Sequence, residues 1–361
     1  MKKIFIFGYY GFKNAGDDAI LDSIIRDFRK KDENISFSVL TYNSEYIKNR
    51  FNVEPVSRSR YSDIIKHIKN SDLVISGGGS LLQDVTSSRS LYYYIAMILL
   101  AKFFGKRVMF YCNGYGPVTK PRNKSIMKWV VSKVDLITLR DEKSYEEIIS
   151  MENNSNVYLT ADAAFTMEKQ EDSRIDDILK AEGISHEGNL VGISVRPWKN
   201  DNNTIDLFRK VARFLIEKGY KVVFIPMKFP DDKEISEEIL KGLDNSAYVI
   251  KNYYSPSEVS GILGKCNFII GVRLHSLIFS AINEIPFIGV EYDPKIKAFC
   301  QMVEQNNAGD IENLTFDQIC NNILELEKEY DSRLAKIKKY KSILKGKVNA
   351  SAQMGIDLLT K

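Results

Sequence analysis

The chain has 361 residues, of which 44% are hydrophobic and 27% charged, with a net charge of +4. This composition is typical of a soluble globular protein, and the length exceeds one ordinary core, so we expect two domains and no special affinity for nucleic acid. The longest apolar stretch, Leu91 to Phe104, is too short to span a bilayer, and four scattered cysteines without metal-type spacing favour a reduced, cytoplasmic protein.

Strand-like and helix-like segments alternate along the chain, which favours an α/β fold with parallel sheets and crossover helices. The first series has strands at 4–7, 37–40, 73–76, 107–111, 135–138 and 157–159, with helices at 19–30, 61–69 and 91–104. The second has strands at 190–195, 221–225, 268–270 and 287–290, with helices at 204–218, 234–243, 257–263 and 277–282, and a helical tail from 316. We predict two Rossmann-like domains, residues 1–166 and 190–361, joined by a polar linker at 167–189 and ending in a basic C-terminal helix.

The most informative stretch is Gly271-Val272-Arg273-Leu274-His275-Ser276, which lies between a buried strand and a helix. Backbone N–H groups and a helix N-terminus converge at such turns, where open α/β sheets bind ligands. The guanidinium of Arg273 suits a carboxylate or phosphate, and His275 is suited to proton transfer near neutral pH. The sequence therefore indicates an anionic ligand that undergoes proton transfer. The structural alternative is an arginine that caps loop carbonyls beside a packed histidine.

Other candidate sites also follow predicted strands. They are the loop Gly8 to Asp18, the triple glycine Gly77-Gly78-Gly79, Ser194-Val195-Arg196 before Trp198, and Pro226-Met227-Lys228 before Asp231-Asp232. The structural alternatives are a tight turn for the Gly8 loop, a surface arginine stacked on Trp198 for Arg196, and a solvated loop for the last site. At the triple glycine, we expect a ligand or the other domain to approach the backbone. The glycine spacings fit neither a dinucleotide nor a phosphate-loop motif, and no Gly-x-Ser-x-Gly elbow is present. The only histidines are His67, His186 and His275, and no metal-type cluster occurs.

Seven motifs in order resemble the polysaccharide pyruvyl transferase family, in particular its cell-wall branch, which modifies the polymer that anchors S-layer proteins. They span Ile4 to about Lys295 and are Gly8 to Asp17, Ser76 to Asp84, Gly114-Tyr115-Gly116-Pro117, Arg140-Asp141, Ala161-Asp162, Ser194-Val195-Arg196 and Arg273 to Ser276. Two positions depart from the family pattern: alanine follows Asp162 where proline is common, and Lys228 stands where histidine is common.

The resemblance implies a GT-B-like fold, with two Rossmann-like domains facing a cleft, phosphoenolpyruvate as co-substrate, and no metal or other cofactor. The acceptor it implies is an N-acetylmannosamine residue in a disaccharide on undecaprenyl diphosphate, converted to a 4,6-linked pyruvate ketal. We expect Arg273, Arg196, Ser276 and Lys295 to hold the donor. His275 donates the proton, either to the enol carbon or to the departing phosphate, and Asp84 is a candidate base. On the acceptor side we expect Tyr10, Phe12, Asn14, Asp17, Gly78, Gly79 and Arg140.

Two other functions fit parts of the sequence. A glycosyltransferase of the same fold would use a sugar nucleotide as donor, and a carbohydrate-binding module would bind without turnover. A basic run from Arg333 to Lys347 adds an expectation about location, because a lipid-linked acceptor requires access to the inner leaflet, whose anionic lipids attract lysines. We expect this helix to pack an apolar stripe on a Rossmann half and to bind the inner face of the membrane reversibly.

Overall fold

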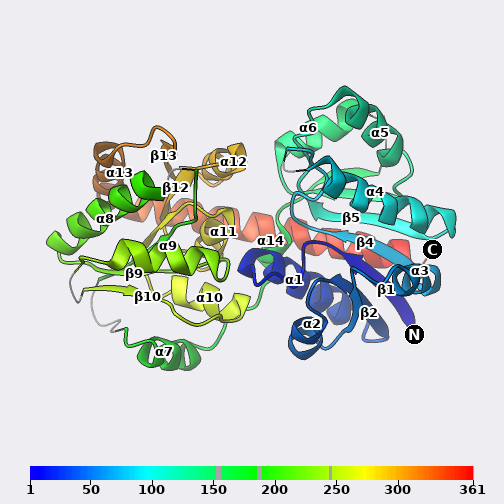
Figure 1. The fold of residues 1–361 in the computed structure, drawn as a ribbon, viewed down its shortest axis with the longest axis horizontal. Coiled ribbons are helices and arrows are strands. Elements are labelled where there is room, and N and C mark those ends of the chain that lie inside the picture. Colours follow the sequence, from blue (N-terminus) through cyan, green and yellow to red (C-terminus); the bar gives the residue numbers. More distant parts are fainter. Residues whose placement is uncertain (86, 152–155, 185–188, 200, 244–245, 361) are drawn as a thin grey trace. The chain divides into compact units, whose positions relative to one another are not determined.

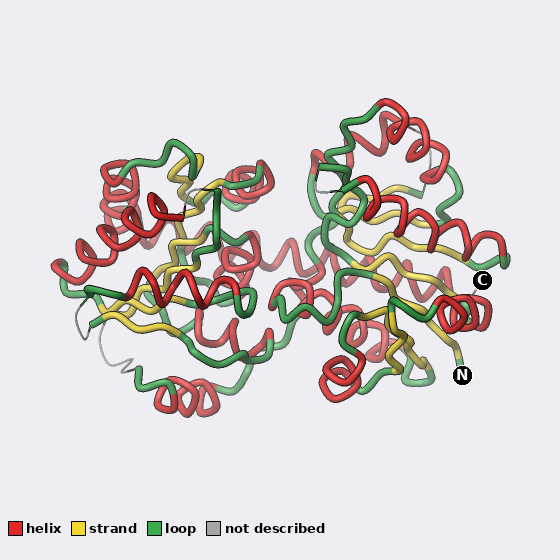
Figure 2. The backbone as a smooth tube through the Cα atoms, viewed as in Figure 1, coloured by secondary structure: helices red, strands yellow, loops and turns green. Residues whose placement is uncertain are grey.

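The computed structural model describes residues 1–85, 87–151, 156–184, 189–199, 201–243 and 246–360. These residues form two compact units. The first consists of Met1–Phe12, Asp17–Met167 and Leu344–Lys361, and the second of Lys13–Gly16 and Glu168–Ile343. Each unit contains one parallel sheet with helices packed on both faces, as Figures 1 and 2 show. The predicted α/β class is therefore confirmed.

The first unit has a seven-stranded sheet in the order β3-β2-β1-β4-β5-β6-β7. Its strands are β1 (Lys2–Phe7), β2 (Ile35–Thr41), β3 (Glu54–Ser57), β4 (Leu73–Gly77), β5 (Arg107–Asn113), β6 (Leu136–Leu139) and β7 (Val157–Leu159). Its helices are α1 (Ala15–Lys31), α2 (Ser44–Phe51), α3 (Tyr61–Asn70), α4 (Ser88–Phe103), α5 (Pro121–Val131) and α6 (Glu142–Met151), with a 3-10 turn at Ala163–Thr166. Strands β2 and β3 are added on one side of β1, and β4 to β7 on the other. The strand order therefore changes direction between β1 and β4, and their carboxyl ends are the expected place for a ligand.

Alternate strand residues of this sheet pack on different helices. Phe5, Val74 and Phe110 lie in the core formed with α3, α4, α5 and α6. On the other face, Met109 and Phe28 of α1 approach Gly355 so closely that a Cβ there would lie 2.5 Å from the Phe28 ring. Burial on both faces explains why the central strands are almost continuously apolar.

The second unit has a six-stranded sheet in the order β10-β9-β8-β11-β12-β13. Its strands are β8 (Leu190–Ser194), β9 (Lys221–Phe224), β10 (Ala247–Val249), β11 (Phe268–Gly271), β12 (Phe287–Glu291) and β13 (Asn306–Asp310). Its helices are α7 (Asp172–Ala181), α8 (Asp201–Glu217), α9 (Asp231–Leu240), α10 (Pro256–Leu263), α11 (Leu274–Ile282), α12 (Pro294–Met302), α13 (Phe316–Lys328) and the first part of α14 (Tyr330–Thr360). Here the reversal lies between β8 and β11.

The domain boundaries differ from the prediction at two places. The predicted linker contains α7, in which Ile175, Ile178 and Leu179 are buried. The prediction missed this helix because its few apolar residues form an amphipathic stripe within a mostly polar segment. Residues 185–188 of that segment, including His186, lie outside the described residues. The C-terminal helix also does not belong wholly to the second domain, because it is part of the first unit from Leu344 onward. There, Arg107 Nη1 donates a hydrogen bond of 2.5 Å to the carbonyl of Leu358.

The apolar stripe predicted on the basic helix consists of Leu334, Ile337 and Leu344, with Tyr340 and Ile343 close to the same face, and it is buried in part, since Leu334 and Tyr340 are half-buried. Ile337 and Leu344 are buried, whereas Ile343 is 46% exposed. No helix among the described residues has both the length and the apolar character needed to cross a membrane.

Candidate functional site

A buried carboxylate holds the arginine that follows β11. Asp232, in the first turn of α9, has no exposed surface, and it accepts hydrogen bonds from Arg273 Nε at 3.0 Å and Nη2 at 2.5 Å. The same carboxylate accepts the backbone N–H groups of Met227 and Lys228 at 3.2 and 3.0 Å. Burial lowers the pKa of Arg273, but the charge and hydrogen bonds of Asp232 raise it by a larger amount. The pKa of Arg273 therefore lies above its ordinary value. The guanidinium is thereby fixed at the carboxyl end of the sheet.

A second guanidinium lies at the same edge of the sheet. Arg196 follows β8, and its Cζ lies 4.1 Å from the ring centroid of Tyr292 and 5.5 Å from that of Trp198. Among the described residues it forms no ion pair, and its buried Nε has no hydrogen-bond partner. Burial, followed by the charge of Arg273, lowers the pKa of Arg196. The contact with Trp198 that the structural alternative named is present, although Tyr292 is closer, and the two like charges favour an anion beside them.

His275 lies directly under the backbone of Gly16. Arg273 is the N-cap residue of α11, so His275 is in the first turn of that helix. A Cβ on Gly16 would lie only 2.0 Å from His275 Nδ1, and glycine is therefore required there. The segment Lys13–Gly16 is held on the second unit by hydrogen bonds from Ala15 N to Met227 O at 2.8 Å and from Phe229 N to Lys13 O at 3.0 Å. This packing positions the imidazole.

The remaining donor candidates have local partners. Ser276 is fully buried, and its hydroxyl donates to the carbonyl of Arg273 at 2.6 Å, so its contact supports the turn. Lys295 Nζ lies 3.0 Å from Asp293, the N-cap of α12, and Lys228 Nζ donates to Asp231 at 2.6 Å. Lys295 follows β12, next to β11 in the sheet, so its backbone belongs to the same edge as that of Arg273.

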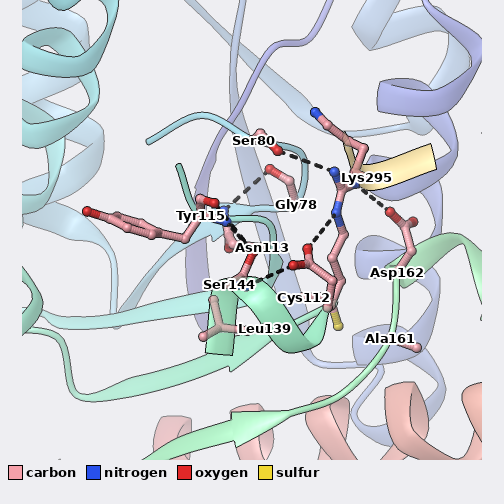
Figure 3. Close-up of polar contacts among 12 residues, drawn as sticks. Gly78, Ser80, Cys112, Asn113, Tyr115, Leu139, Ser144, Ala161, Asp162 and Lys295 are labelled. Carbon is pink, nitrogen blue, oxygen red and sulfur yellow. Dashed lines mark hydrogen bonds and ion pairs between the residues drawn. The ribbon is translucent and has the colours of Figure 1, made fainter. Parts of the chain in front are cut away.

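In the first unit, Arg140 forms a buried ion pair at the end of β6. Its Nη1 donates to Asp162 at 2.7 Å and its Nη2 to the hydroxyl of Ser80 at 3.3 Å. Figure 3 shows Ser80 and Asp162 in this network, with Asn113 nearby donating to the carbonyl of Gly78 at 3.4 Å. The strand ends of β4, β5 and β6 are thus tied together by polar contacts.

The triple glycine is explained largely by packing. A Cβ at Gly77 would lie 2.3 Å from the hydroxyl of Tyr10, and one at Gly78 would lie 2.3 Å from Ile20 of α1. Packing within the first unit therefore accounts for two of the three glycines, and the expected approach of a ligand or of the other domain stays a prediction. Only Gly79, with φ +66°, has open space, its nearest neighbour being Asp17 Oδ1 at 3.6 Å from the position of a Cβ.

Two acceptor-side candidates have hydrogen-bond partners within the protein. Tyr10 is 1% exposed, and its hydroxyl donates to the carbonyl of Gly77 at 2.6 Å. Asn14 accepts from Gly16 N at 3.1 Å and belongs to the second unit. By contrast, Phe12 is half-buried, and its ring lies 4.0 Å from that of Tyr9 and 4.8 Å from that of Tyr42.

Asp84, the candidate base, binds the loop before α5. Its carboxylate is 4% exposed and accepts four hydrogen bonds, from Thr119 N and Oγ1, Lys120 N and Asn123 Nδ2, at 2.8 to 3.1 Å. Burial raises the pKa of Asp84, but these hydrogen bonds lower it by more, and its net pKa lies far below the ordinary value. A carboxylate with these contacts is a weak proton acceptor, so its geometry is that of a loop anchor.

Sequence reasoning did not select Asp232, Tyr292 or Tyr42 as site residues. Asp232 was visible as half of an acidic pair after a predicted strand, but sequence spacing does not reveal which carboxylate reaches Arg273. Tyr292 and Tyr42 directly follow β12 and β2. An aromatic residue at a strand end is the pattern that would have identified both.

The sequence matches the family model described as polysaccharide pyruvyl transferase over residues 14–294. A relative in Erwinia amylovora, the amylovoran biosynthesis protein AmsJ, is 24% identical over 311 residues, which cover 80% of this chain and 74% of AmsJ.

Solved structures with the same fold include the S. aureus MnaA–UDP co-structure and a glycosyltransferase from Rickettsia africae. The first has a TM-score of 0.68 at 15% identity, covering 100% of this chain and 98% of the other. The second has a TM-score of 0.65 at 7% identity, covering 99% and 97%. These likenesses confirm the predicted GT-B-like fold class, while the family match covers most of the chain. The chain belongs to the polysaccharide pyruvyl transferase family.

Proposed function

We propose that this pyruvyl transferase uses phosphoenolpyruvate as donor and binds it at Arg273 and Arg196. The observation that carries the proposal is the pair of guanidiniums at the ends of β8 and β11, with Asp232 as the buried carboxylate of Arg273. Phosphoenolpyruvate carries a carboxylate and a phosphate, which match two planar forks. Lys295 is a third positive group on the same edge of the sheet.

In the proposed reaction, His275 is the proton donor. A proton added to the methylene carbon of phosphoenolpyruvate leaves a carbocation-like centre at C2, which a sugar hydroxyl attacks while its proton returns to His275. The second hydroxyl then displaces inorganic phosphate, which takes the remaining proton, and closes the ketal ring. The immobilised imidazole beneath Gly16 supports this role for His275. Asp84 has no part in this scheme.

For the acceptor we propose an N-acetylmannosamine residue of a disaccharide on undecaprenyl diphosphate, a precursor of the wall polymer that anchors S-layer proteins. The order of motifs from Gly8 to Ser276 supports this choice. Such an acceptor lies in the inner leaflet, so the enzyme would work in the cytoplasm, reversibly bound at the membrane face. The exposed lysines of α14, Lys339 and Lys345, supply charge for this attachment.

The test is an incubation with phosphoenolpyruvate and a synthetic lipid-linked disaccharide ending in N-acetylmannosamine. We expect release of inorganic phosphate and an acceptor whose mass has increased by one ketal-linked pyruvyl group. A parallel incubation with UDP-sugars in place of phosphoenolpyruvate addresses the glycosyltransferase alternative. Sugar transfer from a UDP-sugar, without phosphate release from phosphoenolpyruvate, would overturn the proposal.

A further inference from the structure

Three aromatic rings form a stack at the carboxyl ends of β1 and β2 in the first unit. The rings of Tyr9 and Phe12 are 4.0 Å apart with an interplanar angle of 7°, and those of Phe12 and Tyr42 are 4.8 Å apart at 20°. Tyr42 is 71% exposed and Tyr9 37% exposed. Single exposed aromatic residues are common, but a stacked group that leaves an outer ring open to solvent is a surface suited to a flat ligand. We call these three residues the aromatic platform.

A cation and backbone contacts hold the platform in place. Arg58, just after β3, has its Cζ 5.9 Å from the ring centroid of Phe12 and 4.7 Å from that of Tyr93 on α4. Tyr42 N donates to the carbonyl of Tyr10 at 3.1 Å, which fixes the backbone of the most exposed ring. The backbone that carries Tyr42 and the ring of Phe12 are thus already held in place before a ligand binds, which lowers the entropic cost of binding.

A polar hollow begins at the residue after Tyr42. Its volume is about 400 Å³, and it is lined by Asn43, Glu45, Tyr46, Asn49 and Arg50 of α2 and its N-cap. The lining residues carry amide, carboxylate, phenol and guanidinium groups, of which the Tyr46 hydroxyl donates to Asp18 at 2.5 Å and the Asn43 side-chain carbonyl accepts from Tyr46 N at 3.0 Å.

We propose that the aromatic platform is the acceptor subsite and that a pyranose ring of the acceptor saccharide stacks on Tyr42. A pyranose has one face of C–H groups, whose positive hydrogens are attracted to the negative face of an aromatic ring. Its hydroxyls project from the rim of the ring and remain free to form hydrogen bonds beside the aromatic face. The inference rests on the proposed function, since it names the surface that holds the second substrate.

The charge around the platform distinguishes a saccharide from a peptide or a nucleic acid as occupant. The hollow contains both Glu45 and Arg50, so it is not a uniformly basic surface of the kind that phosphate backbones require. It is also small, and its polar residues outnumber its apolar ones, unlike the apolar centre of a protein interface. Neutral hydroxyl groups suit such mixed partners.

The experiment compares Tyr42→Ala, Tyr42→Phe and the control Tyr158→Ala. Tyr158 is a 38% exposed tyrosine on β7, in the same unit but outside the platform. The probe is a soluble disaccharide ending in N-acetylmannosamine on a short alkyl aglycone, used with phosphoenolpyruvate in steady-state assays and alone in binding titrations followed by NMR. We expect Tyr42→Ala to raise the acceptor KM and Kd about five- to tenfold, as loss of an aromatic contact implies, with no change in the KM for phosphoenolpyruvate. Tyr42→Phe retains the ring and should stay near the parent, as should Tyr158→Ala.

Each result decides between the two proposals. An unchanged acceptor KM and Kd in Tyr42→Ala, or the same loss in Tyr158→Ala, would overturn the platform while leaving the transferase reaction standing. If the parent protein releases no phosphate from phosphoenolpyruvate, the proposed function fails. The titration then still tests the platform, because a saccharide that binds the parent and not Tyr42→Ala supports it, and no binding to the parent refutes it.

Discussion

At the scale of single residues, Asp232 is a carboxylate with no solvent-exposed surface. A buried carboxylate is tolerated when it is paired and hydrogen-bonded, and removal of one member of such a pair leaves an uncompensated charge. Asp232 satisfies this condition through Arg273 and two backbone N–H groups. Its neighbour Asp231 forms an ion pair with Lys228 while 42% of its side chain stays exposed. The two adjacent aspartates therefore make a matched comparison.

We expect Asp232→Asn to destabilise the protein by about 3 kcal/mol, because it leaves Arg273 beside Arg196 without a counter-charge. Asp231→Asn should cost at most about 1 kcal/mol, since its pair is screened by solvent. Urea unfolding of parent and variants, monitored by circular dichroism, measures both. Equal costs for the two substitutions would show that the buried pair has no special weight.

The role of His275 can be tested through the glycine above it. His275→Ala should lower kcat about a hundredfold or more if the imidazole is the proton donor. Gly16→Ala places a methyl group where the ring now lies, so the imidazole must move, and kcat should fall although the histidine is still present. His67→Ala is the control, because that histidine lies on α3 in the first unit. Normal phosphate release by folded His275→Ala would remove the residue from the mechanism.

Sequence reasoning located some residues well and others poorly, for a physical reason. Arg196, Arg273 and His275 follow apolar strands, and the carboxyl ends of parallel strands meet at one edge, so their backbones could be placed. Side-chain direction could not be placed in the same way. Tyr10 turns inward to Gly77, and Asp84 is surrounded by donors from a loop more than thirty residues away in sequence. Adjacency in sequence does not encode these long-range hydrogen bonds.

At the scale of elements, α14 contains two glycines in different surroundings. A Cβ at Gly355 would lie 2.5 Å from the Phe28 ring and 3.1 Å from the sulfur of Met109, whereas one at Gly346 would have no neighbour within 4 Å. Both positions are helical. Alanine is a better helix former than glycine by about 1 kcal/mol. The gain in helix propensity from a Gly→Ala substitution is therefore the same at both positions, and only the packing differs.

We expect Gly346→Ala to raise the melting temperature and Gly355→Ala to lower it. The second substitution overpacks a close helix contact, which costs about 1–3 kcal/mol and outweighs the gain in helix propensity. Differential scanning calorimetry of the two variants measures the shifts. A rise in both would mean that Phe28 and Met109 yield without penalty.

The basic face of α14 is partly neutralised. Lys341 and Lys338 lie 2.7 and 4.0 Å from Glu284, and Lys336 lies 3.0 Å from Glu304. The sequence pattern could not reveal these partners, since they come from distant segments. Any attraction to anionic lipid should therefore come mainly from Lys339 and Lys345, which are exposed.

Replacing Lys339 and Lys345 by glutamine should reduce co-sedimentation with vesicles that contain anionic lipid, by about 1 kcal/mol per charge at low salt. Activity on a soluble acceptor should be unaffected. Lys124 and Lys128, exposed on α5, provide a control with the same change in net charge. If both pairs of substitutions weaken sedimentation equally, the attraction is general and does not belong to α14.

At the scale of the whole molecule, the proposed donor site would take its positive charge from arginine. Arg196 and Arg273 give two permanent positive charges, of which Asp232 compensates one. A divalent ion is then not required to neutralise phosphoenolpyruvate. We expect phosphate release to continue after exhaustive treatment with EDTA. Loss of activity that is restored by added magnesium would contradict this prediction.

The fold class followed from the alternation of strands and helices, but the division into units did not. The sequence indicates one crossing between domains, near residue 167, because composition changes there. The structure assigns Lys13–Gly16 to the second unit and Leu344–Lys361 to the first. These assignments depend on which surfaces meet after folding, such as Ala15 against Met227 and Gly355 against Phe28. Neither short segment has a composition that distinguishes it from its neighbours.

The return of the last eighteen residues to the first unit affects the order in which the protein matures on the ribosome. Domains generally fold as units, with the N-terminal one first, as the chain emerges. Here the sheet of the first unit lacks part of its helical cover until residues 344–360 have been made, because Val348, Ala352 and Leu359 complete the buried surface. The first unit is thus completed only after the second unit has been synthesised, and a nascent chain stalled before Leu344 would expose apolar surface to chaperones and proteases.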